Sequence, residues 1–315
     1  MVKFHSSLIG NPGVEYVYGI DPASEQDNLA LTILEVNADH RRIVYCWTLN
    51  KQKLRERMKG QDGKIGFYNY CARKIRDLMK VFPTKHIGID TQGGGLQLME
   101  ALHNPSDMLP GEDPFWPYIV DNANPTQPDP FWWEMEKKAT DLESGKHNIH
   151  PINFAKSEFT SEANHGLKKD FENKTTLFPA YDGAVLAEAI AHDQLLGREY
   201  DTLEDCILEI EELKNELATI ELTQTTAQAR ERWDTPEVKR PGGKKGRLRK
   251  DRYSALVIAN MLARAIENRL KGTQYSSAGG YAGQSKSFKK SGYYHGPDHI
   301  IERLNPAAYR GISRR

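Results

Sequence analysis

Two segments of the chain share one pattern, an apolar strand that ends in an aspartate and is followed by a tight polar turn. They are residues 16–23 (YVYGIDPA) and residues 86–91 (HIGIDT), the second continuing into Gln-Gly-Gly-Gly. An aspartate at the end of a buried strand is held rigidly at the edge of the sheet, beside the loops. On neighbouring strands, Asp21 and Asp90 would bring four carboxylate oxygens together, which suits Mg²⁺ or Mn²⁺.

Each aspartate also has a simpler interpretation. Pro22 has no backbone N–H, so strand pairing ends at Asp21, and an Asx-type turn would explain that residue alone. Asp27 lies later in the same turn and is either a supporting carboxylate behind the metal ligands or a turn residue. After Asp90, the glycines at 93–95 let the backbone approach a ligand closely, and the helix that follows favours anions at its N-terminus.

The densest basic stretch of the chain is residues 239–252 (KRPGGKKGRLRKDR), in which Asp251 is the only acid. Its proline and glycines predict a hairpin or mobile loop, a shape that can follow a phosphate backbone without reading bases. The cations that we expect to contact nucleic acid are Lys244, Lys245, Arg247, Arg249 and Lys250.

Asp251 opens a long helix over residues 253–270 (YSALVIANMLARAIENRL), which carries a wide apolar stripe. A helix N-terminus favours a carboxylate, so capping alone would explain Asp251. Its position next to the basic stretch, in a chain that also carries Asp21 and Asp90, predicts instead a third metal-binding carboxylate. Carboxylates that gather metal beside cations that gather phosphate indicate metal-dependent chemistry on nucleic acid.

The overall composition limits the cellular compartment and the source of any nucleic-acid affinity. Among 315 residues, Lys+Arg and Asp+Glu both number 43, so any affinity for nucleic acid comes from local charge asymmetry. The three cysteines lack metal-binding spacing and indicate a reducing compartment. The first residues carry no apolar signal sequence, and no stretch approaches the roughly 20 apolar residues of a membrane span. We expect a soluble, cytoplasmic protein without a membrane partner.

The pattern of elements predicts an α/β fold. Three strands joined by short turns form an antiparallel meander, and strand-helix-strand units follow it as parallel crossovers. The expected strands are 15–21, 29–36, 41–49, 85–90 and 116–120, and the expected helices between them are 67–82 and 96–102. This order is that of the RNase H-like fold, a mixed central sheet with three antiparallel strands then parallel strands, flanked by helices. In that fold the first and fourth strands are neighbours.

The remaining segments are less regular. Residues 121–147 are rich in proline, asparagine and charge, and predict a loop or insertion, and a helix is expected over 157–171. Residues 200–221 are strongly acidic with apolar residues every three or four positions, which predicts an amphipathic helix with a solvated acidic face.

Three motifs together resemble the nuclease domain of the large terminase subunit of tailed bacteriophages. They are Gly-Ile-Asp21-Pro-Ala before a polar pair and an apolar strand, Ile-Gly-Ile-Asp90 before a glycine-rich turn and helix, and the basic lead into Asp251. The resemblance covers roughly residues 13–270. It implies that the three aspartates hold two divalent ions, Mg²⁺ or Mn²⁺, that cut double-stranded DNA. Independently of the resemblance, Lys250 or Arg249 would offset negative charge that builds on the phosphate.

Composition and the resemblance together predict a domain organisation, and the resemblance implies partners. The lead-in is residues 1–12, the RNase H-like nuclease domain is 13–271 with a basic loop at 239–250, and a flexible tail rich in Gly, Ser, Tyr and Lys is 272–315. Large terminase subunits normally carry an ATPase motor with a P-loop, and no GxxxxGK[ST] occurs in this sequence. We therefore expect a terminase ATPase motor domain or chain, the portal and the small terminase subunit as partners, in the host cell cytoplasm.

Three other functions stay open from the residues. A resolvase- or transposase-type RNase H-like nuclease would share the carboxylates but prefer branched DNA or DNA ends. An actin-like kinase or ATPase would use Asp21 and the glycines at 93–95 around ATP. A DNA-binding packaging component would bind without cutting. Incubation with plasmid DNA and Mg²⁺ or Mn²⁺, with and without ATP, distinguishes them.

Overall fold

The structure is a computed structural model, which describes residues 3–22, 28–60, 65–117, 145–153, 157–225, 230–239 and 245–277. The strands are β1 (Glu15–Asp21), β2 (Leu29–Val36), β3 (Arg41–Leu49), β4 (Thr84–Asp90), β5 (Phe115–Pro117), β6 (Lys146–Ile152), β7 (Thr176–Leu177), β8 (Glu221–Thr225), β9 (Arg230–Asp234), β10 (Glu237–Lys239) and β11 (Lys245–Arg247). The helices are α1 (Lys51–Arg57), α2 (Phe67–Val81), α3 (Gly95–His103), the short 3₁₀ helix η1 (Pro105–Asp107), α5 (Ser157–Glu172), α6 (Gly183–Leu195), α7 (Leu203–Thr219) and α8 (Asp251–Ser277).

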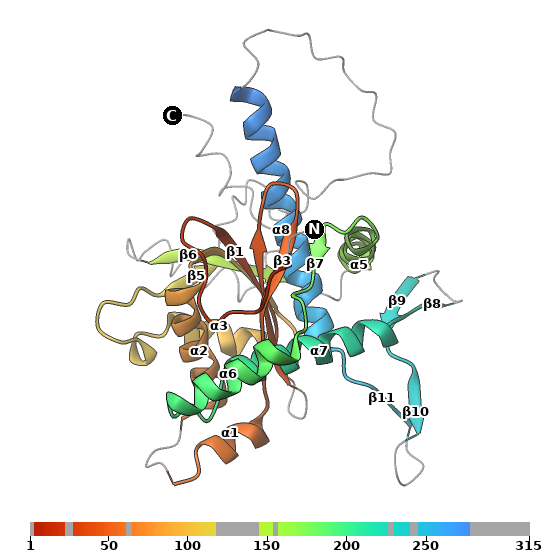
Figure 1. Ribbon diagram of the computed structural model, residues 1–315. Helices are drawn as coiled ribbons and strands as arrows, with labels where there is room; N and C mark the ends of the chain where they lie inside the picture. Colours follow the sequence, from red (N-terminus) through yellow and green to blue (C-terminus); the bar gives the residue numbers. More distant parts are fainter. Residues whose placement is uncertain are drawn as a thin grey trace, which may run out of the picture.

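Seven strands form one mixed sheet in the order β5-β6-β4-β1-β2-β3-β7 (Figure 1). β1, β2 and β3 pair antiparallel, whereas β1 with β4, β4 with β6 and β5 with β6 pair parallel. The first and fourth strands are therefore neighbours, as in the RNase H-like fold, and the predicted fold class is confirmed. Two further hairpins, β8–β9 and β10–β11, lie outside the central sheet.

The central strands are buried on both faces. Every residue of β2 is buried, and β1 is buried from Tyr16 through Ile20. A strand covered on both sides needs a nearly continuous apolar run rather than alternating apolar and polar residues. The sequence of β2, LALTILEV, is such a run and therefore predicts a buried strand.

The two faces of the sheet are covered by different helices. On β1, the Tyr18 hydroxyl donates to the carbonyl oxygen of Phe82, just after α2, at 2.7 Å. The neighbouring residue Gly19 points to the other face, where the backbone of α8 at Ala255 and Ala259 passes directly over it. Successive residues of a strand point to opposite faces, so Asp21 lies on the same face as Gly19, the face that α8 covers.

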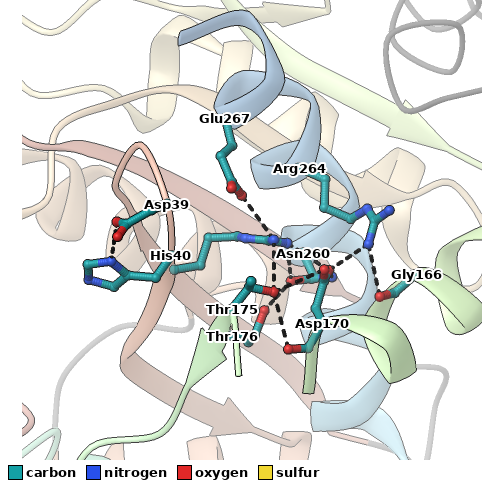
Figure 2. Close-up of polar contacts among 10 residues, drawn as sticks. Asp39, His40, Gly166, Asp170, Thr175, Thr176, Asn260, Arg264 and Glu267 are labelled. Carbon is teal, nitrogen blue, oxygen red and sulfur yellow. Dashed lines mark hydrogen bonds and ion pairs between the residues drawn. The ribbon is translucent and has the colours of Figure 1, made fainter. Parts of the chain in front are cut away.

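The middle of α8 is tied to the rest of the domain by a buried polar network (Figure 2). The Arg41 guanidinium on β3 contacts Asp170 of α5 at 2.7 Å and Glu267 of α8 at 2.9 Å. Asn260 of α8 donates to Asp170 at 2.7 Å, and Arg264 pairs with the same carboxylate at 2.8 Å. Removing one partner of such a buried pair typically costs about 3–5 kcal/mol, so this network fixes α8 against β3 and α5.

Several boundaries differ from the sequence prediction. β5 covers 115–117 and the rest of the expected strand lies outside the described residues, as does most of the expected loop at 121–147; its last two positions open β6. α8 continues to Ser277, past the expected tail boundary at 271, and residues 278–315 lie outside the described part. Of the helices described, none is both long and apolar enough to cross a membrane.

Candidate metal centre

β1 and β4 bring the first two aspartates to the same end of the sheet. The parallel register pairs Ile20 with Ile89, so Asp21 and Asp90 are the next residues on neighbouring strands. Asp90 is buried, and its Oδ1 accepts a hydrogen bond from the backbone N–H of Gln92 at 3.1 Å. This Asx turn orients the Asp90 side chain, so the simple interpretation of a turn and the functional one apply together at this position.

The third aspartate comes from the start of α8. The Asp251 Oδ2 accepts a hydrogen bond from the backbone N–H of Asn28, at the start of β2, at 3.2 Å. Asn28 is held in turn, because its Oδ1 accepts from the Asn50 amide at 2.9 Å, and the Oδ1 of Asn50 accepts from the N–H of Lys53 in α1 at 2.8 Å. The carboxylate of Asp251 is therefore joined to the residue before β2, across 223 positions of sequence.

Asp251 and Asp90 both act electrostatically on Asp21. The pKa of Asp21 is raised well above its ordinary value, first because the surrounding protein desolvates the carboxyl group, and then because of the negative charges of Asp251 and Asp90. A hydrogen bond from Ser254 and the charge of Lys250 act in the opposite direction. The structure thus brings Asp21, Asp90 and Asp251 together, from β1, β4 and α8.

A glycine two residues before each strand aspartate makes this convergence possible. A Cβ atom on Gly19 would overlap the Ala255 carbonyl oxygen and lie 2.5 Å from the Ala259 nitrogen. A Cβ atom on Gly88 would press on Ile258 and lie 2.8 Å from Leu262 Cδ1. Because both positions lack a side chain, α8 packs close to β1 and β4, with its first residue at the strand ends.

The glycines that follow Asp90 serve the protein's own packing. Gly93 has a φ of 60°, which favours glycine. The space beside Gly94 is filled by the Tyr68 ring, and that beside Gly95 by the Asp90 carbonyl oxygen. The sequence predicted that this turn lets a ligand approach; at Gly94 and Gly95 the close neighbours are protein atoms instead, and the turn secures the end of β4.

The basic segment lies partly beside the site, and Arg247 and Lys250 are paired with an acid of the protein. Arg247 pairs with Asp234 at 3.2 Å and donates to the carbonyl oxygen of Thr235 at 2.6 Å. Lys250 pairs with Asp234 at 3.4 Å and donates to the Trp233 carbonyl oxygen at 2.9 Å. Although burial acts to raise it, the pKa of Asp234 is lowered, chiefly by Lys250.

The structure describes only some of the other residues that were predicted to contact phosphate. Arg249 is exposed, and Lys245 is the first residue of β11. Lys244 and Asp27 lie outside the described residues. The predicted loop at 239–250 overlaps the β10–β11 strand pair, whose pairing joins residues 237–239 to 245–247.

Sequence analysis missed the acidic residues that hold the start of α8. Glu216 and Glu209 of α7 both contact Arg252, at 2.7 Å and 2.6 Å. The expectation of a solvated acidic face on this helix is wrong at these two positions, because Glu216 is buried and Glu209 keeps only 15% of its side-chain surface. Their spacing of seven residues, two helical turns, was the available signal, but their partner is identified only by the tertiary structure.

The donor chemistry of the site fits a hard divalent cation. Asp21, Asp90 and Asp251 offer only carboxylate oxygens, the ligands that Mg²⁺ and Mn²⁺ prefer. Across the described ranges, no three His, Cys, Asp or Glu side chains already form a group spaced to hold a metal ion. Burial and, after it, repulsion from Asp251 and Asp90 raise the pKa of Asp21, and a bound cation would relieve that repulsion.

Comparisons with known proteins returned similarities of structure alone. No protein-family model matches the sequence, and no curated protein matches it. The chain is similar to the large terminase nuclease of the thermophilic phage G20c with bound magnesium, at 13% identity and a TM-score of 0.43, covering 82% of this chain and 85% of that chain. The large terminase nuclease domain of Thermus phage P74-26 gives 12% identity, a TM-score of 0.42 and coverage of 82% and 89%. The HK97 bacteriophage large terminase gives 12% identity and a TM-score of 0.40, covering 80% of this chain and 40% of that chain.

Proposed function

We propose that the chain is a divalent-metal-dependent endonuclease that cuts double-stranded DNA. The observation that supports the proposal is the placement of the three aspartates on three elements at one end of the sheet. Asp21 and Asp90 end neighbouring parallel strands, and Asp251, at the start of α8, accepts a hydrogen bond from Asn28, the residue before β2. Carboxylates that lie near one another and are partly removed from water usually need a cation or a proton to compensate them. A site made of carboxylates alone beside a basic segment suits phosphodiester hydrolysis.

The residues take distinct roles in this proposal. Asp21, on the central strand, would lie between two Mg²⁺ or Mn²⁺ ions, with Asp90 and Asp251 completing one ion each. When bound, a pair of ions activates water and stabilises the leaving oxygen of an in-line displacement. Lys250, whose charge already acts on Asp21, would offset negative charge that builds on the phosphate.

The biological setting is part of the proposal. The sequence motifs resemble terminase nuclease domains, so we propose that cutting serves viral genome packaging in the host cell cytoplasm. An ATPase motor, as a domain or a separate chain, would then supply DNA translocation, with the portal and the small terminase subunit as further partners. Because carboxylate-bound metal ions and cationic side chains act on the phosphodiester backbone rather than on base edges, we expect little sequence preference in cutting.

A plasmid assay tests the activity. Supercoiled plasmid is incubated with the chain and Mg²⁺ or Mn²⁺, with and without ATP, beside Asp21→Asn and a control, Asp39→Asn, whose carboxylate is 84% exposed on the β2–β3 turn. We expect ATP-independent nicking and linearisation by the wild type and Asp39→Asn, and none by Asp21→Asn. ATP turnover without cutting would favour the kinase alternative, a mobility shift without cutting would favour a binding protein, and preference for branched DNA would favour a resolvase-type enzyme.

A further inference from the structure

The residue after Asp251 is held by two acids of another helix. Arg252 Nε donates to Glu209 Oε2 at 2.6 Å, and Arg252 Nη1 donates to Glu216 Oε1 at 2.7 Å. The second oxygen of Glu216 accepts from the backbone N–H of Tyr253 at 2.9 Å, so Glu216 also caps α8. Glu209 is itself oriented by the Thr48 hydroxyl of β3, which donates to it at 2.8 Å. We call Arg252, Glu209 and Glu216 the α8 clamp.

The clamp acts on a short stretch in which consecutive residues are fastened to different parts of the fold. Lys250 is bound to the end of β9 through Asp234, and Asp251 is bound to the start of β2 through Asn28. Arg252 is bound to α7 through the clamp. With contacts on both sides of it along the chain, Asp251 has little freedom to move relative to β1 and β4.

We propose that Arg252 is a positioning residue for Asp251, and that the α8 clamp sets where the first turn of α8 presents the Asp251 carboxylate to Asp21. This inference rests on the proposed metal-dependent nuclease function. Arginine suits the role because its planar, rigid fork can satisfy two carboxylates in fixed directions, which the single ammonium group of lysine cannot do. Groups behind metal ligands typically change metal affinity or activity about 10- to 100-fold when altered.

Charge and geometry make opposite predictions for Arg252. Removing a cation near the site would, through charge alone, strengthen the binding of another cation. Removing the fork would, through geometry, displace Asp251 and weaken that binding. A variant without the charge therefore tells the two effects apart by the sign of the change in Mn²⁺ affinity, and a variant that keeps the charge isolates the geometric effect.

The test measures Mn²⁺ binding to the full chain by titration calorimetry, without DNA, for the wild type, Arg252→Lys and Arg252→Met. We expect Arg252→Lys to bind Mn²⁺ about 10- to 100-fold more weakly, and Arg252→Met to bind it more weakly still. In plasmid cutting at saturating Mn²⁺, the KM for DNA should stay near the wild-type value while the Mn²⁺ requirement rises. If Arg252→Met does not fold, Arg252→Lys decides the question alone.

Arg41→Lys is the matched control. Arg41 is also a buried arginine between two acids, Asp170 and Glu267, but it holds the middle of α8 rather than its first turn. We expect this variant to lose stability and to keep its Mn²⁺ affinity. Wild-type affinity in Arg252→Lys, tighter binding by Arg252→Met, or an equal loss in Arg41→Lys would each overturn the positioning role. A wild type that neither binds Mn²⁺ nor cuts plasmid would overturn the proposed function, and this inference with it.

Discussion

Substitution of Gly19 by alanine tests whether close packing of α8 on β1 builds the site. The new Cβ would overlap the Ala255 carbonyl oxygen and lie 2.5 Å from the Ala259 nitrogen. Both are backbone atoms, so no side-chain rotation relieves the contact and the helix itself must shift. Overpacking of a core usually costs about 1–3 kcal/mol, and we expect about 3 kcal/mol or more here because the contact is with a helix backbone that the Arg41 network also holds.

Two other glycines calibrate that magnitude. Gly88→Ala would meet the ends of the Ile258 and Leu262 side chains, which can move, so we expect a loss of about 1–2 kcal/mol. Gly183→Ala, at the start of α6 with no neighbouring atom near its Cβ position, should be neutral or stabilising by up to about 1 kcal/mol. Urea unfolding followed by circular dichroism measures all three, and an unchanged slope m identifies a change in stability alone.

The functional consequence follows from the same displacement. Because Asp251 is the first residue of α8, folded Gly19→Ala protein should also bind Mn²⁺ more weakly than folded Gly88→Ala protein. If Gly19→Ala unfolds within about 1 kcal/mol of the wild type, or no less stably than Gly88→Ala, the account of how the glycine brings α8 to the strand ends is refuted.

Three further predictions concern charge, DNA and ATP. The pKa of Asp21 is raised in the folded protein, so the stability linked to its proton is complete below the unfolded pKa of about 3.9 and is lost as pH rises through the folded pKa. Without divalent cations, Asp21→Asn should therefore have a higher melting temperature than the wild type at pH 8, and this difference should close toward pH 4. An equal difference at both pH values would contradict this. Arg249→Ala, which removes an exposed cation of the basic segment, should lower the slope of log K for DNA against log salt by roughly 0.9, and an unchanged slope would place the DNA path elsewhere. Arg247→Ala, which breaks a pair with buried Asp234, should lower the melting temperature. The purified chain should hydrolyse no ATP, and turnover above background in a phosphate-release assay would reject a separate motor.

The sequence was sufficient to predict the strands that carry the site. β1, β2 and β3 match the expected ranges because strands buried on both faces need continuous apolar runs. The position of Asp251 at the start of a helix could be predicted because the basic segment ends there and a long apolar helix begins. The adjacency of β1 and β4 came from the expected fold, and the register of Ile20 with Ile89 bears it out.

Other features depend on partners that are distant in sequence. β6 was missed because its sequence, KHNIHPI, is polar. One of its histidines, His150, is buried in the fold, where its Nε2 lies 3.0 Å from Nδ1 of His86 on the neighbouring strand β4. The role of Gly19 follows only from the path of α8 above it. Glu209 and Glu216 looked like part of a solvated face, because an acidic helix shows no sign of a buried arginine until the fold supplies Arg252.

The central claim is that Asp21, Asp90 and Asp251 together hold divalent cations, and calorimetric titration with Mn²⁺ tests it most directly. The wild type and each single Asp→Asn variant are titrated at pH 7.5, with Asp39→Asn as the exposed control. The account predicts binding of two ions to the wild type and to Asp39→Asn, and a marked loss of affinity in each of the three site variants. Unchanged Mn²⁺ binding in Asp251→Asn, with a loss confined to Asp21→Asn and Asp90→Asn, would contradict it.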